Sequence, residues 1–279
     1  MRAALFIAAL TMSTPQCAPS APADRIATLN LENYPKHGDQ GSNALEMIRG
    51  LKVSAVALQE ITRPEAFAAQ AREELGPSWR FVWARPGGFQ RVGLLYDSRQ
   101  WDLIDTIAHE ETLLHRQAKP AFEVVARPRV GGWLAGRAEP VHFFIVHLKA
   151  TNKSEAIRAR QLAALAPILA ERRAAGKQVV FLGDFNSTNP TDRTRLDGLA
   201  DTVSLSWASE DLDCTHYWAR KEACTGHALD HVMTWAVPDA ITVGGACVTD
   251  GCDPGDTCPV YRSRISDHCP VVVDLAPFE

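Results

Sequence analysis

The stretch that most constrains this chain is residues 179–187, which read VVFLGDFNS. A short run of branched and aromatic apolar residues closed by a glycine is typical of a buried strand. Asp184 and Asn186 end the run, and side chains two residues apart on an extended chain point the same way. Sites in α/β folds are built at such strand ends, so this one would offer a proton acceptor and an amide to one substrate atom. An Asx turn explains the same two residues equally well.

Polar residues also stand at the ends of five other predicted strands. The apolar runs of these strands are residues 25–31, 53–58, 141–148, 229–233 and 270–275. The polar residues at their ends are Asn30, Glu60, His147, Asp230, and Asp267 with His268. A turn, a helix cap or a structural histidine accounts for each one alone. Their joint occurrence favours one shared site.

The remaining sequence predicts helices and loops around these strands. Apolar residues at helical spacing predict helices over residues 43–51, 64–75, 154–173 and 191–199. We expect irregular, cysteine-bearing loops over residues 201–226 and 245–263. Because no repeat or linker-like stretch follows residue 24, we expect one domain over residues 24–279.

The order of these motifs resembles a known family. GDFN at 183–186 and SDH at 266–268, with QE at 59–60 and HL at 147–148, resemble the endonuclease/exonuclease/phosphatase superfamily. This superfamily includes pancreatic deoxyribonuclease, inositol polyphosphate phosphatases and bacterial sphingomyelinases. The resemblance covers essentially all of residues 24–279. It implies an α/β (α+β) four-layer sandwich, in which two mixed β-sheets pack face to face with helices outside.

The resemblance also implies a divalent metal, Mg²⁺ or Mn²⁺, and cleavage of a phosphate ester by water. Attack on an anionic phosphodiester requires charge neutralisation and an activated water. Mg²⁺ prefers oxygen ligands and takes few of them from protein. Glu60 therefore fits as the main metal ligand, with Asn30 and Asp267 assisting.

The resemblance assigns the catalytic roles to five residues. Asp230 would orient His268 by accepting its ring N–H, which raises the basicity of that ring. His147 would face the phosphate as a donor or general acid, and Asp184 would orient or deprotonate the water. Asn186 would hold the phosphate or Asp184. Whether the aspartate or the histidine is the base stays open.

Two further positions carry a weaker match. Arg127 corresponds to a phosphate-contacting arginine of pancreatic deoxyribonuclease, and an exposed structural arginine explains it at least as well. Gln90 stands where that enzyme has a glutamate that orients its first catalytic histidine. An amide at this position stabilises a charged His147 less well, which puts the general-acid role of His147 in doubt.

The N-terminus resembles an export signal. Arg2 precedes a short apolar run, and residues 21–23 fit a cleavage site, so residues 1–23 are interpreted as a signal peptide. Cys17 leaves a lipid anchor as an alternative. We therefore expect a secreted or periplasmic protein, without a transmembrane segment. Six of the seven cysteines follow residue 23, which indicates disulfides rather than a zinc site. A local bridge from Cys214 to Cys224 is the preferred single pairing.

The sequence leaves the substrate open. Loss of residues 1–23 removes one of the 29 basic residues and none of the 33 acidic ones, which changes the net charge from −4 to −5 and gives no general sign of nucleic-acid binding. Basic residues near the motifs favour a local cationic rim and hence a nuclease that cleaves DNA or RNA. They are Arg85, Arg91, Arg127, Arg129, Lys149, Lys153, Arg158 and Arg160. The alternatives are a phosphatase, a sphingomyelinase-like lipid phosphodiesterase and a catalytically silent binding protein. We expect a monomer.

Overall fold

The computed structural model describes Pro22 and residues 24–278, except residues 115–117, 130–135, 137 and 222. Apart from Pro22, the predicted signal peptide and Cys17 lie outside the described residues. No helix among the described residues is long and apolar enough to cross a membrane.

The first of two large sheets has the strand order β13-β14-β1-β2-β4-β3. β1 and β2 run parallel, and the other neighbours are antiparallel. The strands are β1 (Arg25–Tyr34), β2 (Ala55–Ile61), β3 (Trp79–Trp83), β4 (Arg91–Asp97), β13 (Ala240–Val243) and β14 (Val271–Asp274).

The second sheet has the order β5-β6-β7-β8-β12-β9, with β7 and β8 as its parallel pair. β8 contains residues 179–184 of the VVFLGDFNS stretch, and β7 is the apolar strand that ends in His147. The strands are β5 (Trp101–His109), β6 (Ala121–Pro128), β7 (Val141–His147), β8 (Gln178–Asp184), β9 (Ser206–Trp207) and β12 (Asp230–Thr234).

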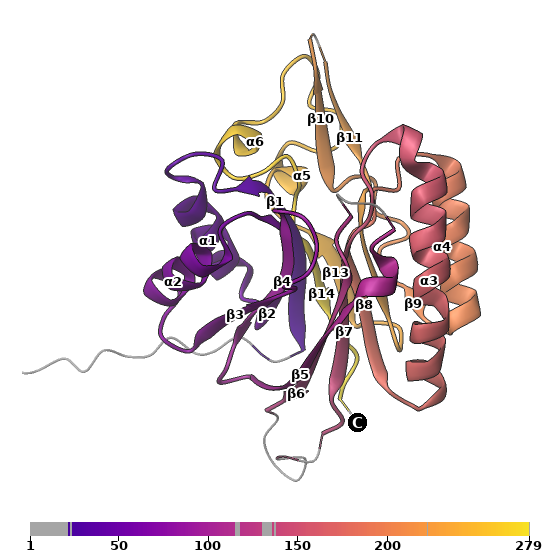
Figure 1. Cartoon of the computed structure of the whole chain (residues 1–279). Helices are drawn as coiled ribbons and strands as arrows, with labels where there is room; N and C mark the ends of the chain where they lie inside the picture. The colour runs from indigo at the N-terminus through magenta and orange to yellow at the C-terminus, as the bar shows by residue number, and fades with distance from the viewer. Residues whose placement is uncertain are drawn as a thin grey trace, which may run out of the picture.

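The two sheets pack face to face, with helices on both outer faces (Figure 1). One apolar core lies between the sheets and includes Leu94 of the first and Phe143 of the second. A second core joins the first sheet to α1 (Gln40–Leu51) and α2 (Pro64–Glu74), and a third joins the second sheet to α3 (Glu155–Ala174) and α4 (Pro190–Val203). Short 3₁₀ turns, η1 (Glu110–Thr112) and η3 (Asn152–Ser154), complete this part. The α/β sandwich with two mixed sheets is therefore confirmed.

Gly183 fixes how β7 and β8 meet at the end of the sheet. Its backbone has φ +140°, and a Cβ there would lie 2.1 Å from the Val146 carbonyl oxygen. Only glycine permits this approach. In the resulting register Val146 pairs with Gly183 and His147 pairs with Asp184, so two predicted site residues become direct neighbours.

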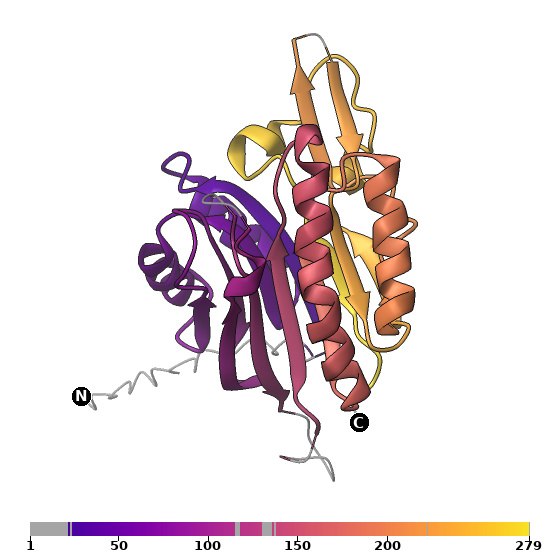
Figure 2. The same ribbon diagram turned by 45° about the vertical axis from the view of Figure 1, so that its right-hand side comes forward.

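The two predicted irregular loops contain regular structure. Residues 201–226 include β9 and a hairpin of β10 (His216–Arg220) and β11 (Ala223–His227). Residues 245–263 include α5 (Ala246–Thr249) and part of α6 (Val260–Arg264). The hairpin projects beyond the ends of the two sheets beside the α5 and α6 segment (Figures 1 and 2).

Two disulfides join the hairpin region to the α5 and α6 segment, and a third joins α5 to the residue that follows His268. They are Cys214–Cys252, Cys224–Cys258 and Cys247–Cys269. The predicted Cys214–Cys224 bridge is wrong, because the hairpin register pairs Cys224 with Ala219 while Cys214 lies before β10. The strand pairing keeps the two cysteines apart, and each bonds across to the other segment.

Candidate functional site

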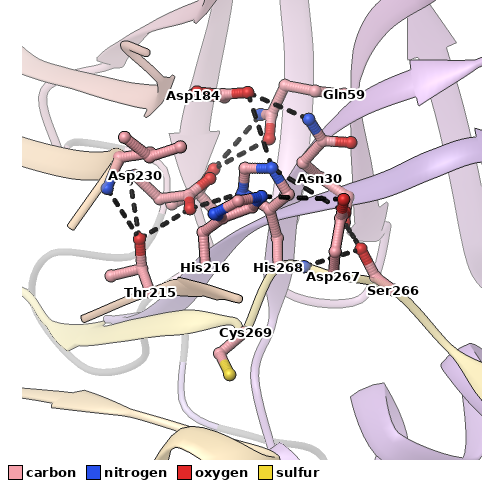
Figure 3. A network of polar contacts seen from close by, with 12 residues as sticks. Asn30, Gln59, Asp184, Thr215, His216, Asp230, Ser266, Asp267, His268 and Cys269 are labelled. Carbon is pink, nitrogen blue, oxygen red and sulfur yellow. Dashed lines mark hydrogen bonds and ion pairs between the residues drawn. The ribbon is translucent and has the colours of Figure 1, made fainter. Parts of the chain in front are cut away.

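The polar strand ends predicted from the sequence converge at one end of the two sheets (Figure 3). β1 supplies Asn30 and β2 supplies Glu60 from the first sheet. β7, β8 and β12 of the second sheet supply His147, Asp184 and Asp230. The SDH segment before β14 supplies the remaining pair, Asp267 and His268. These residues are brought together because the sheets face each other with their ends aligned.

Asp230 and His268 form a tight pair. The His268 Nδ1 lies 2.7 Å from the Asp230 Oδ2, and both side chains are almost fully buried. The Thr215 hydroxyl also donates to Oδ2, at 2.7 Å, and accepts from the Asp230 backbone N–H. Burial opposes charge on the ring, but the Asp230 and Asp184 carboxylates raise the pKa of His268 well above its usual value. The raised pKa favours the protonated ring, whose Nε2 faces the cluster.

Asp184 lies at the centre of the cluster. Its Oδ2 accepts from the Asn30 amide at 3.0 Å, and its Oδ1 accepts from the Asn186 backbone N–H at 2.9 Å. The Nε2 atoms of His147 and His268 lie 3.5 and 3.8 Å from Oδ2. Burial raises the pKa of Asp184 to about 7. A carboxylate with that pKa is suited to accept a proton near neutral pH.

Asn186 holds Asp184 through its backbone rather than through its side chain. The Asn186 amide instead donates to the Leu148 carbonyl oxygen at 3.1 Å. It therefore ties the end of β8 to the segment after His147. Its φ of +50° turns the chain away from the sheet directly after the site.

Glu60 and His147 face each other across the two sheets. The Glu60 Oε1 lies 3.6 Å from the His147 Nε2 and 3.4 Å from the Asn30 amide nitrogen. Burial raises the pKa of Glu60. Burial, with Lys119 nearby, holds the pKa of His147 well below its usual value, so this histidine is neutral. The His147 Nδ1 is buried and has no hydrogen-bond partner among the described residues.

The donor set fits a hard divalent cation. Asp267 has a buried Oδ1 with no hydrogen-bond partner among the described residues, and the imidazoles of His216 and His268 hold its pKa at about 2 despite burial. The Asn30 Oδ1 accepts only the Glu32 backbone N–H at 2.9 Å, which leaves a second lone pair. Glu60, Asn30 and Asp267 thus offer the oxygen ligands that Mg²⁺ and Mn²⁺ prefer.

Gln90 and Arg127 do not have the surroundings predicted for them. Gln90 lines a cavity of about 490 Å³ with Glu60 and His147, but its amide donates to Asn33 and leaves the His147 Nδ1 without a partner. Arg127 is placed outside the cluster. In the register of β6 and β7, Val141 pairs with Ala126 and Ile145 pairs with Phe122. Arg127 therefore lies beside the start of β7, whereas His147 ends that strand. At about 3.3 Å per residue the two are about 20 Å apart along the strand direction. The antiparallel direction of β6 carries it to the opposite end of the sheet.

The cationic rim is smaller than the sequence suggested. Lys149 lines the cavity, and Arg85 and Arg91 line a neighbouring one of about 330 Å³. Arg158 is buried against Asp192, and Arg129 pairs with Asp102 near the far end of the sheet, so neither lies on the rim.

Sequence reasoning missed three residues around the site. Lys119 lines the cavity with Glu60 and His147, and burial lowers its pKa. Thr215 supports Asp230, and the His216 Nε2 lies 3.6 Å from the Asp267 Oδ2. Each comes from a loop or hairpin without apolar periodicity. The one available signal was the proximity of Thr215 and His216 to Cys214.

Comparison of the whole fold gives clear matches, although no family profile matches the sequence and no curated protein sequence is detectably similar. D. rerio TDP2 complexed with a single-strand DNA product has a TM-score of 0.65 and 14% identity, over 91% of this chain and 98% of that one. An endonuclease/exonuclease/phosphatase family protein from Bacteroides thetaiotaomicron has a TM-score of 0.59 and 15% identity, over 89% and 96%. A mannosyl-6-phosphatase from the same organism has a TM-score of 0.63 and 16% identity, over 91% and 99%.

Proposed function

We propose that this chain, which has the fold of the endonuclease/exonuclease/phosphatase superfamily, is a metal-dependent phosphoester hydrolase. One observation carries the proposal: four carboxylates and two histidines from five strand ends form one cluster, and two of them line the adjoining cavity. The carboxylates are Glu60, Asp184, Asp230 and Asp267, and the histidines are His147 and His268. Burying so many ionisable groups together destabilises the folded state, and such clusters are therefore characteristic of functional sites.

The metal would be held by Glu60, Asn30 and Asp267. When bound, Mg²⁺ or Mn²⁺ would neutralise phosphate charge as a Lewis acid. Asn30 and Glu60 lie on β1 and β2, early in the sequence, whereas Asp267 lies in the SDH segment, late in the sequence. The site therefore forms only when these three segments have come together.

Asp184 is the proposed proton acceptor. Water adds to phosphorus while its proton passes to the Asp184 Oδ2. The bond from phosphorus to the leaving oxygen breaks with its electron pair passing to that oxygen, which takes up a proton from solvent. The His268 imidazolium donates from Nε2 to a phosphoryl oxygen, and Asp230 stabilises the ring's charge. Because its raised pKa favours the protonated form, His268 is less suited than Asp184 to be the base. The neutral His147 would orient the phosphate by hydrogen bonding.

The proposed substrate is nucleic acid, cleaved as a phosphodiester by an exported nuclease. Lys119 and Lys149 beside the site, and TDP2 with a single-strand DNA product as a fold relative, support this choice. The mannosyl-6-phosphatase of the same fold supports a phosphatase as the second candidate. The three disulfides are compatible with export, as the predicted signal peptide requires.

Chelation tests the reaction class. We expect EDTA to abolish hydrolysis of a simple phosphodiester such as bis(p-nitrophenyl) phosphate, and added Mg²⁺ or Mn²⁺ to restore it. Glu60→Gln should need far more metal for the same rate, because it removes the main ligand's charge. Glu46→Gln removes an exposed carboxylate of α1 and serves as the control. Turnover that ignores EDTA, or no turnover with any metal and any phosphoester, would refute the proposal.

A further inference from the structure

A second cluster of metal-binding groups lies on the hairpin side of the site. Nitrogens of His216 and His268 and a carboxylate oxygen of Asp267 all lie within 4.8 Å of one another. The His216 Nε2 is 3.6 Å from the Asp267 Oδ2, and the His268 Nε2 is 3.9 Å from the Asp267 Oδ1. Figure 3 shows the two rings and the carboxylate turned toward one another. His216 plays no part in the hydrolysis proposed above.

We propose that His216, Asp267 and His268 form a binding site for a transition-metal ion, with Zn²⁺ as the ion to which it is best suited. Tetrahedral zinc with bonds of 2.0–2.2 Å separates its ligand atoms by about 3.4 Å. The contacts of 3.6 and 3.9 Å from the two rings lie near this value and end on the two oxygens of the one Asp267 carboxylate. Small side-chain rotations would bring all three atoms onto one ion. The site is therefore nearly formed by the protein alone.

Hydrogen bonding at the three residues supports a ligand role. The two contacts to Asp267 exceed hydrogen-bond length, and its buried Oδ1 has no hydrogen-bond partner among the described residues. If these groups served only to pair with each other, contacts of hydrogen-bond length would be expected. An ion between them would instead bind the carboxylate and the Nε2 atom of each ring.

The surroundings of His268 match those of a metal-bound histidine. Its Nδ1 lies 2.7 Å from the Asp230 Oδ2, which fixes the ring and directs Nε2 to the cluster. Ligand histidines are usually held in this way by a carboxylate on the other nitrogen. The side chains of His216 and Asp267 are 15% and 17% exposed, so an ion can enter and a fourth position can take water.

The ligand types separate this site from the Mg²⁺ site. Two imidazoles and one carboxylate suit Zn²⁺, whereas Mg²⁺ takes oxygen ligands. Affinity for such nitrogen-containing sites rises steeply from Mn²⁺ toward Cu²⁺ and Zn²⁺. Asp267 belongs both to the proposed Mg²⁺ ligands and to the proposed Zn²⁺ ligands, and a bound zinc ion would occupy the His268 Nε2. Zn²⁺ should therefore inhibit hydrolysis, and this consequence, unlike binding itself, rests on the proposed function.

Direct titration tests the site without turnover. Chelator-stripped, disulfide-intact protein is titrated with Zn²⁺ against a chromophoric zinc indicator at fixed pH, because ligand histidines must lose a proton to bind. We expect one site whose affinity falls by at least about 100-fold in His216→Gln, since loss of a mere supporting partner already costs 10–100-fold. Co²⁺ in place of Zn²⁺ should give visible bands in the wild type that change in this variant.

His227→Gln is the matched control. His227 pairs with His216 across the β10–β11 hairpin but has no ion-pair contact to a carboxylate among the described residues. It should bind zinc like the wild type. Equal affinity in the wild type and His216→Gln, or an equal loss in His227→Gln, would overturn the proposal. His216→Asn replaces His216→Gln if thermal melting shows that the latter fails to fold.

Inhibition provides the functional measurement. Each protein's Mg²⁺-supported rate is followed as Zn²⁺ rises, relative to its own rate without zinc. His216→Gln should need about 100-fold more Zn²⁺ for half inhibition, following the loss in affinity. Unchanged inhibition in this variant would contradict a shared site. If no phosphoester is hydrolysed at all, the proposed function fails while the titration still decides the zinc site.

Discussion

Two site residues adopt backbone conformations that side chains rarely accept. Glu60 has φ +62° and Asn186 has φ +50°, both in the left-handed region. For a residue other than glycine this conformation is unfavourable by roughly 1–3 kcal/mol. At Glu60 it coincides with the irregular register between β2 and β4, which turns the carboxylate toward Asn30 and His147. The strain is retained because the surrounding sheets hold the carboxylate where the metal would bind.

The Asp230 and His268 side chains should act as one unit. We expect Asp230→Asn and His268→Ala each to lower kcat by roughly 10³-fold or more, with the double variant little worse than the poorer single one. The reason is that Asp230 contributes through the charge and orientation of His268, at 2.7 Å. The measurement is kcat on a simple phosphodiester at saturating metal. Losses that multiply in the double variant would mean that the two residues contribute independently.

His231 should make the fold sensitive to acid. It is fully buried between Ser187 and Ser209, at 2.7 and 3.2 Å, and burial lowers its pKa to about 3. An unfolded histidine titrates near 6.5, so only the unfolded state gains the proton as pH falls below that value. The stability contributed by neutral His231 is therefore complete above about pH 6.5 and is lost progressively toward pH 3.

The size of the effect gives a direct test of this histidine. Between pH 7 and pH 5 the loss attributable to His231 should be about 2 kcal/mol in the free energy of unfolding. His231→Gln should lose that much less than the wild type over the same interval, measured by urea unfolding at both pH values. An identical pH dependence in the two proteins would show that His231 does not remain neutral in the folded state.

At the scale of elements, the sequence predicted strands and helices with strong apolar patterns. β7 and β8 are continuous buried runs, and α3 was predicted to within a residue at each end. The β10–β11 hairpin was missed because most of its residues are exposed or half-buried and show no clean alternation. Missing this hairpin also explains the wrong Cys214–Cys224 pairing, because the strand register, and not nearness in sequence, decides which cysteines meet.

For the site, too, the sequence predicted residues that belong to motifs but not residues whose position depends on the tertiary fold. Motif resemblance identified Asp184, Asp230 and His268, which the structure brings together. Arg127 was misassigned because sequence alone does not tell which end of an antiparallel strand meets the site. Lys119 was missed because its loop reaches the cavity only through the fold.

The Cys247–Cys269 disulfide should support activity as well as stability. Cys269 follows His268, and its backbone N–H donates to the Thr215 carbonyl oxygen at 2.7 Å. Because Thr215 also bonds Asp230, loosening this bridge should disturb the pair. We expect Cys247→Ser with Cys269→Ser to lower unfolding free energy by about 3 kcal/mol and to reduce kcat of the folded protein.

The control for that effect is the Cys224–Cys258 bridge, which joins the hairpin to the segment before α6 and adjoins no site residue in sequence. Its removal should lower stability similarly but leave kcat of the folded fraction nearly unchanged. Intact mass and peptide mapping of the native protein should show all three bridges, with six hydrogens fewer than the reduced form. Six alkylatable thiols in native protein would contradict the disulfide assignment.

At the scale of the whole molecule, the proposed reaction and the recognition of substrate would lie on different parts of the fold. Two facing sheets fix the polar cluster at one end, while loops and the hairpin supply the surface around it (Figure 2). Folds of this kind serve unrelated substrates through such surrounding surfaces. Four cations among the described residues line the cavities here: Lys119 and Lys149 the one that Glu60 and His147 also line, and Arg85 and Arg91 the neighbouring one.

The salt dependence of turnover tests whether these cations bind a nucleic-acid backbone. If all four contact phosphates, kcat/KM on DNA should fall by roughly 100-fold between 50 and 200 mM salt, because counterion release weakens each contact. Hydrolysis of bis(p-nitrophenyl) phosphate should change far less. Lys119→Gln with Lys149→Gln should flatten the salt slope on DNA. Lys177→Gln, at the start of β8 and so at the opposite end of the sheet, should leave the slope unchanged.

The same assay must be run in parallel on plasmid DNA, RNA, sphingomyelin vesicles, inositol phosphates and sugar phosphates, each with Mg²⁺. A nuclease should cleave DNA or RNA with the salt slope described above. Released inorganic phosphate or hydrolysed lipid beside intact DNA and RNA would end the nuclease proposal. That outcome would keep the proposed catalytic assignment, because the roles proposed for Asp184, Asp230 and His268 concern the phosphorus and not the group attached to it. A weak salt slope with rapid DNA cleavage would instead mean that recognition lies on the β10–β11 hairpin, where Trp218 is 47% exposed and stacks with Arg220.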